Sequence, residues 1–204
     1  FTDMREGIDF LRKNIDTARG IAATAVHRGG LTALTLTALL LERNTFNDPA
    51  QPEDGLQGFG IALTIAGVGV FLGAFLAPYG VARFGRHRWI KFAMFASAAA
   101  PLILAASQTE IALSVTAFLA SFFGQNIKVT NDALVQSKID DYYRGRVFAV
   151  YDVVVNGAIV SGGLIAALLL PTSGLTPNVP LVVSAAYFLV AVVVLRSAKF
   201  KAIY

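Results

Sequence analysis

Lys128 and Asp132 are the residues best placed to do chemistry, because they are opposite charges within an otherwise apolar stretch. A spacing of four residues puts both side chains on one face of a helix, where lysine and aspartate pair. Ionised groups in an apolar span are costly and are therefore candidates for function. Protonation of Asp132 would free Lys128, so that a substrate could compete for either charge. The alternative interpretation is a structural pair whose lower end is close to water.

Two amide side chains belong to the same polar stretch. Gln125 extends the face that carries Lys128 and Asp132, and Asn131 lies beside it. Amides both donate and accept hydrogen bonds, so these four residues could contact a polar substrate. We therefore treat the stretch as a candidate site for substrate binding or proton coupling.

Arg28 is a second charged group deep in an apolar run. It lies about eight residues into the run, or roughly 12 Å at 1.5 Å per residue, which is too deep for easy contact with water. One interpretation is a cation that faces a cavity and binds an anionic or polar substrate. The other is a cation paired with a carboxylate on a second bundle of helices. The sequence leaves both open.

The sequence gives little indication of catalysis. There is no cysteine, so thiolate nucleophiles and thiolate metal sites are excluded, and the two histidines show no metal-ligand spacing. No nucleotide-binding motif is present. We expect no enzyme activity, no metal and no cofactor. The pI of about 9.5 reflects basic residues that face lipid headgroups, so nucleic acid is not an expected partner.

The elements that must position these residues are six apolar runs. The chain is 55% hydrophobic over 204 residues, with a mean hydropathy of +0.62. A helix needs about 20 apolar residues to cross the ~30 Å core of a bilayer. The sequence therefore predicts an all-α membrane protein with six transmembrane helices, at residues 20–41, 58–81, 89–107, 110–136, 147–170 and 179–195.

The basic residues alternate between the two sides of these runs. Fourteen of the seventeen lysines and arginines precede the first run, follow the last, or lie in the connections at 82–88 and 137–146 and their immediate neighbours. Cytoplasmic loops carry the excess of basic residues in membrane proteins. We therefore expect a plasma (inner) membrane protein that crosses the bilayer several times and has both termini in the cytoplasm.

Three parts of the chain are expected. Residues 1–19 are predicted to form a cytoplasmic amphipathic linker helix, residues 20–196 a transmembrane bundle, and residues 197–204 a cytoplasmic tail. The first three spans end on the outer side and the last three begin there, so the bundle would consist of two inverted three-helix repeats, as in many carriers. The chain begins with phenylalanine, which we interpret as an excerpt from a longer protein.

Small residues indicate where helices approach closely. Gly69 and Gly73 lie one helical turn apart in the second span, and Gly157 and Gly162 lie in the fifth. Helices pack closely where glycine replaces a side chain. We expect these four glycines to make contacts between this bundle and another.

The connection after the second span resembles a known signature. Arg83, Gly85, Arg86 and Arg88 match the cytoplasmic loop sequence G-x-x-x-D-R-x-G-R-[RK] of the major facilitator superfamily, with Ala82 at the position of its aspartate and Pro78 at that of its first glycine. The segment at 136–149, which includes Arg144 and Arg146, resembles the stretch after helix ten in the enterobactin-exporter and macrolide-efflux branch, with Ile139 and Asp140 replacing the usual Val-Pro.

This resemblance implies the C-terminal six-helix half of a facilitator. It implies a secondary transporter that exports a small molecule by alternating access, is coupled to protons, and has an N-terminal six-helix half as a partner within the lipid bilayer. The arginines of the two loops would then be a conformational switch. Orientation by positive charge alone is the alternative role for them. A non-transporting, facilitator-like subunit or scaffold is the alternative for the chain.

Overall fold

The computed structural model describes residues 2–139 and 141–195, and these residues are almost entirely helical. The elements in chain order are α1 (Thr2–Lys13), α2 (Ile15–Leu41), the π-helix η1 (Glu42–Phe46), α3 (Pro52–Phe84), α4 (Arg86–Ala106), α5 (Glu110–Lys138), α6 (Asp141–Leu169), α7 (Asn178–Leu189) and the π-helix η2 (Val190–Val194). The expected tail at 197–204 lies outside the described residues.

Among the described residues, six long continuous helices, which we call rods, follow α1, because η1 continues α2 and η2 continues α7. Each of the six predicted apolar runs falls on a separate rod. Among the described residues, three helices are long and apolar enough to cross a membrane: Pro52–Phe84, Arg86–Ala106 and Tyr142–Leu169. The apolar segment Asn178–Val193 is shorter. Membrane crossing by α2, α5 and α7 therefore stays a prediction.

The first helix differs from the expected 1–19. It ends at Lys13, and α2 begins at Ile15, so the predicted linker helix is wrong in its C-terminal boundary. Asn14 leaves the helical conformation, with φ −115° and ψ 66°, and its side-chain amide donates to the Phe10 carbonyl at 3.0 Å. This local hydrogen bond competes with the helix, as asparagine side chains commonly do.

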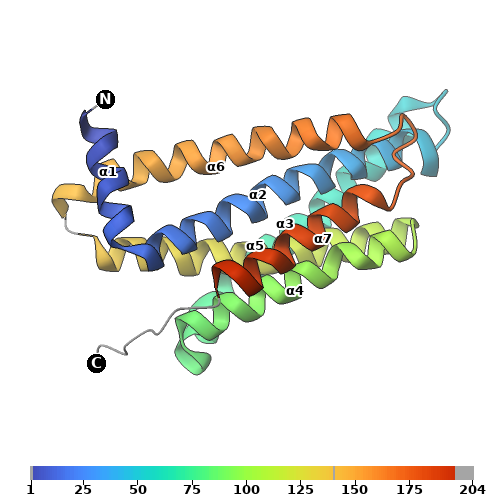
Figure 1. The fold of residues 1–204 in the computed structure, drawn as a ribbon. Coiled ribbons are helices and arrows are strands. Elements are labelled where there is room, and N and C mark those ends of the chain that lie inside the picture. The colour runs from blue at the N-terminus through green and yellow to red at the C-terminus, as the bar shows by residue number, and fades with distance from the viewer. Residues whose placement is uncertain (1, 140, 196–204) are drawn as a thin grey trace.

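Helices α2 and α5 lie at the centre of the bundle. Helix α2 packs against α5, α6 and α7, and α5 packs against α2, α3 and α4. Helices α4 and α7 pack on each other, and α1 crosses the end of the bundle against α6 (Figure 1). The core between them is rich in alanine, including Ala23, Ala93 and Ala120, none of which is exposed. Small side chains let these helices approach closely.

Helices α3 and α6 flank this centre and leave many apolar side chains uncovered. Phe71 and Phe75 on α3 are 70% and 74% exposed, and Val160 and Leu168 on α6 are 70% and 76% exposed. Exposed apolar side chains in such numbers are unfavourable in water and favourable in lipid or against another helix. The two flanking helices therefore supply the outer faces of the bundle.

Three of the four glycines that were predicted to allow close packing do approach other helices of this bundle. A Cβ on Gly69 would reach the Phe118 carbonyl of α5 at 2.5 Å, a Cβ on Gly73 would clash with the next turn of α5, and a Cβ on Gly162 would clash with the backbone of Gly29 on α2. These three glycines therefore pack closely against neighbouring helices of the same bundle, and contacts with a second bundle stay a prediction. Gly157 has open space around it among the described residues.

Candidate functional site

Asp132 is held by two partners from two helices. Its Oδ2 lies 2.5 Å from the Lys128 ammonium group one turn earlier on α5, and its Oδ1 accepts a hydrogen bond from the Tyr151 hydroxyl of α6 at 2.9 Å. The Lys128 and Asp132 side chains retain 37% and 24% of their exposure, so the pair lies at an accessible face. The i, i+4 pairing inferred from the sequence is present, and Tyr151 adds a second helix to it.

Arg28 of α2 lies near the same group of residues. It is half-buried, and its charge acts on the Tyr151 hydroxyl. Within residues 2–139 and 141–195, Arg28 forms no ion pair with a carboxylate. Because Lys128 and Asp132 neutralise each other, the site between α2, α5 and α6 carries one uncompensated positive charge.

Asn131 points away from this site. It is buried, with 1% of its surface exposed, and its amide donates to the Gly20 carbonyl and to the Thr24 hydroxyl of α2, both at 2.8 Å. The structure therefore places Asn131 at the contact between α5 and α2, where its two hydrogen bonds connect the helices. It is adjacent to Asp132 in sequence but lies on a different face.

Gln125 remains on the face of Lys128. It is half-buried, and its Cβ lies 3.2 Å from the position of a Cβ on Gly73 of α3. Its neighbour Asn126 is fully buried and accepts a hydrogen bond from the Trp89 indole of α4 at 3.2 Å. The polar stretch of α5 therefore divides into one face toward the candidate site and one face that binds neighbouring helices.

Sequence reasoning missed Tyr151 and the burial of His27. His27 is 2% exposed and stacks on the Tyr187 ring with centroids 4.7 Å apart, while the Tyr187 hydroxyl donates to the His27 carbonyl at 2.8 Å. Glycine at 124 leaves room for the imidazole, since a Cβ there would clash with it. The sequence signal that could have pointed to Tyr151 was its position next to an aspartate at the start of a predicted span.

The residues of the two basic loops gather at one end of the bundle, which we call the basic end (Figure 1). Arg86 donates to the Ser137 hydroxyl at 3.1 Å, joining the start of α4 to the end of α5. Arg146 pairs with Glu6 of α1, and Gly85 takes a φ of 77° between α3 and α4. Arg83, Arg88 and Arg144 are exposed there. The two loops and α1 are therefore connected to one another.

The opposite end holds an acidic cavity of about 280 Å³ lined by Glu42, Asp54 and Glu110. Glu42 is 5% exposed and accepts a hydrogen bond from Asn47 at 3.2 Å. Burial raises the pKa of Glu42, the Glu110 charge raises it further, and the Asn47 hydrogen bond opposes them. Among the described residues, no group of three histidines, cysteines or carboxylates could hold a metal ion.

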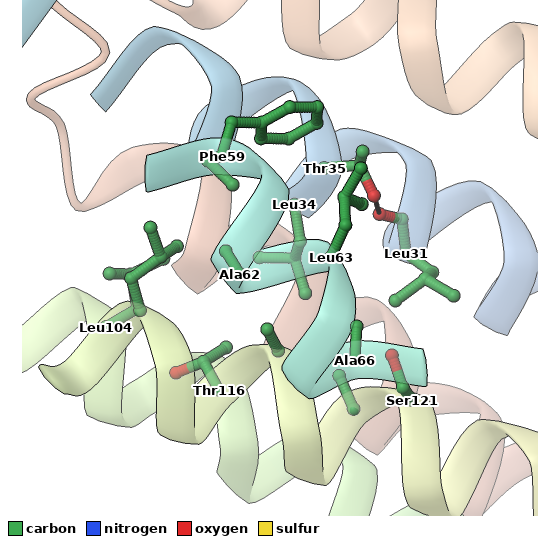
Figure 2. Close-up of a pocket in the computed structure, with 14 residues that line it drawn as sticks. Leu31, Leu34, Thr35, Phe59, Ala62, Leu63, Ala66, Leu104, Thr116 and Ser121 are labelled. Atoms are coloured by element: carbon green, nitrogen blue, oxygen red, sulfur yellow. Dashed lines mark hydrogen bonds between the residues drawn. The ribbon is translucent and has the colours of Figure 1, made fainter. Parts of the chain in front are cut away.

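An apolar pocket of about 160 Å³ lies between α2, α3 and α5 (Figure 2). The figure shows Leu31, Leu34 and Thr35 of α2, Phe59, Ala62, Leu63 and Ala66 of α3, Leu104 of α4, and Thr116 and Ser121 of α5 around it. Its walls are mostly aliphatic, so it excludes charged groups and admits apolar ones.

Long apolar helices packed around a few charged side chains are typical of a helical membrane protein. The chain belongs to the major facilitator superfamily, whose model matches residues 21–201. The family-level resemblance noted in the sequence is thereby confirmed, and the family indicates a membrane protein.

Two curated proteins are similar to the chain. They are uncharacterized MFS-type transporters, one from Mycobacterium tuberculosis and one from Mycobacterium bovis, and each is 32% identical over 170 residues. The match covers 83% of this chain and 38% of each relative, so the chain spans less than half of their length. No solved structure is a significant match.

Proposed function

We propose that the chain is the C-terminal six-span bundle of a secondary transporter that exports a small molecule in exchange for protons. Arg28, Lys128 and Asp132 form its substrate and coupling site. Transport proceeds by alternating access, in which this bundle and an N-terminal bundle rock around a site at the middle of the membrane.

The observation that carries this proposal is the convergence of charged groups between α2, α5 and α6. Lys128 and Tyr151 both bind the Asp132 carboxylate, and Arg28 lies nearby. Protonation of Asp132 would weaken both hydrogen bonds and release Lys128. A carboxylate whose partners are released on protonation can link a proton to a substrate and to a movement of α5 relative to α6.

The packing of the rods supports an architecture of two inverted three-helix repeats. If α2 is exchanged with α5, α3 with α6, and α4 with α7, the contact of α2 with α6 becomes that of α5 with α3. The contact of α4 with α5 likewise becomes that of α7 with α2. All four contacts are present, and the pairs α2 with α5 and α4 with α7 map onto themselves. The smaller contact of α3 with α4 likewise becomes that of α6 with α7.

The membrane environment and the partner follow from the exposed surfaces. The basic end is cytoplasmic because basic loops remain on that side of the plasma membrane. The apolar faces of α3 and α6 suit lipid and a second bundle, and the two curated relatives are more than twice as long as the matched region.

Export is supported by the likeness of residues 136–149 to the efflux branch. The loop arginines, with Gly85, act as the conformational switch.

Substrate flux in liposomes that contain the full-length protein tests this function. With an imposed pH gradient, Asp132→Asn should still carry substrate down its own gradient but lose the dependence on pH, because the titratable group is gone and its shape remains. Asp48→Asn, in an exposed loop, should behave like the wild type. Full pH-driven flux by Asp132→Asn would remove this residue from coupling, and absence of any flux in the wild type would favour a scaffold.

A further inference from the structure

The charged site and the apolar pocket lie along the same faces of two helices. On α2, Leu31 and Thr35 follow Arg28 at helical spacings of three and seven residues. On α5, Ser121 precedes Lys128 by seven residues, or about 10.5 Å along the axis. Residues spaced in this way share a helix face. Along α2 and α5, the apolar residues of the pocket therefore lie next to the charged residues of the site.

Two of the three hydroxyl groups that line the pocket are already occupied. The Thr35 hydroxyl donates to the Leu31 carbonyl at 2.9 Å (Figure 2), and the Thr116 hydroxyl donates to the Ala100 carbonyl at 3.1 Å. Their donors are therefore not available to a ligand. A cavity of about 150 Å³ lined by aliphatic side chains takes up benzene, so a pocket of about 160 Å³ accommodates one apolar group of that size.

The net charge of the charged site determines whether it binds an anion or a cation. Lys128 and Asp132 neutralise each other, which leaves Arg28 as the net charge of the site. A guanidinium binds a carboxylate or similar anion through two parallel hydrogen bonds. Arg28 and Leu31 are about 4.5 Å apart along the helix axis, so a short flexible spacer joins the anion to the apolar group.

We propose that the substrate of this site is a monoanionic amphiphile with one benzene-sized apolar group, bound with its anion at Arg28 and its apolar group in the pocket between α2, α3 and α5. The proposal deepens the proposed transport function and rests on it for its biological meaning. A membrane lipid is disfavoured as the occupant, because a long acyl chain exceeds a pocket of this volume.

The test is equilibrium binding of 4-phenylbutanoate to the full-length protein in nanodiscs of zwitterionic lipid. We expect saturable binding that is stronger than that of 4-phenylbutan-1-ol, which lacks the anion, and of butanoate, which lacks the ring. Equal binding of the alcohol and the acid, or no saturable binding, would overturn the proposal. Competition by phosphatidylglycerol but not by butylbenzene would also overturn it, because the occupant would then be a lipid.

Variants separate the two halves of the site. Arg28→Gln should weaken binding of the acid by about tenfold or more and leave the alcohol unchanged, and Arg28→Lys should retain part of the affinity. Ala117→Leu, which fills the pocket, should weaken both ligands. Arg43→Gln and Ala99→Leu, which change exposed positions of η1 and α4, should change neither. Equal loss for both ligands in Arg28→Gln would overturn the assignment of the anion.

Binding and transport give separable results. If the selective binding is found but no flux occurs in liposomes, the ligand assignment stands and the transport function fails. If pH-driven flux of another substrate occurs and phenylbutanoate neither binds nor competes, the transport function stands and the ligand assignment fails.

Discussion

The Tyr151 hydroxyl donates a 2.9 Å hydrogen bond to Oδ1 of Asp132 and so connects α6 to α5. In the part of the chain that the structure describes, α6 packs mainly against α2, and α5 packs mainly against α3 and α4. Val135 of α5 and Val147 of α6 also belong to one buried apolar cluster. The Asp132 carboxylate therefore supplies a polar connection between α5 and α6 beside this apolar contact.

The Tyr151–Asp132 bond should be measurable as a coupling energy. Tyr151→Phe should lower the thermal stability of the wild type but have little effect in an Asp132→Ala background, because the acceptor is then missing. Interaction energies of residues in contact are about 0.5–3 kcal/mol. Tyr79→Phe on the exposed face of α3 is the control. An equal cost of Tyr151→Phe in both backgrounds would show that the bond contributes nothing.

The topology can be tested with single cysteines, because the natural chain has none. Asp48→Cys should react with a membrane-impermeant maleimide added outside intact cells, and Arg88→Cys should react only after the cells are opened. These positions lie at opposite ends of the bundle in exposed loop or helix-start positions. Reaction of both from the same side contradicts six spans with cytoplasmic basic loops.

The two glycines of α6 should respond differently to alanine. Gly162→Ala places a methyl group against the backbone of Gly29, and overpacking of this kind costs about 1–3 kcal/mol. Gly157→Ala meets open space among the described residues and should leave the stability of this chain unchanged. Thermal unfolding in detergent compares them. A larger loss for Gly157→Ala would mean that the close contact with α2 is wrongly assigned.

Asn131→Ala should destabilise the bundle without changing its substrate preference. The change removes two hydrogen bonds of 2.8 Å to α2 and leaves the Gly20 carbonyl without that donor, which costs about 1–3 kcal/mol. Asn156→Ala, an exposed amide of α6, is the matched control. An altered order of substrate affinities with normal stability would return Asn131 to the binding site.

Stability should depend on the ionisation of Glu42. Its pKa is raised above the ordinary value of 4.5, first by burial and then by Glu110, so the folded state favours the protonated form. Below pH 4.5, Glu42 is mostly protonated in both the folded and the unfolded chain, so it does not reduce the stability. As the pH rises from 4.5 through the raised pKa, ionisation favours the unfolded chain and the stability falls. Glu42→Gln should remove this reduction.

Melting temperatures of wild type and Glu42→Gln across pH 4–8 check the effect of Glu42. The difference between them should grow with pH in favour of the variant. Glu53→Gln, an exposed carboxylate of α3, should show no such trend. A difference that is flat, or that favours the wild type at high pH, means that burial does not penalise the Glu42 charge.

The sequence by itself determined the helical rods and the charge pattern between them. Each rod depends on the local run of apolar residues, and the Lys128–Asp132 pair depends on the geometry of one helix, so neither requires knowledge of other segments. The linker boundary at Asn14 was missed because the break is confined to one residue, across which helical backbone hydrogen bonds continue.

Only the tertiary structure decided which helix faces meet. Asn131 and Asp132 are neighbours in sequence, yet one binds α2 and the other binds Tyr151 of α6. Gly157 and Gly162 are equivalent in sequence, yet only Gly162 meets the backbone of Gly29. The pocket likewise depends on side chains from three main helices. Such contacts join residues far apart in the chain, and their energies depend on packing that no local pattern specifies.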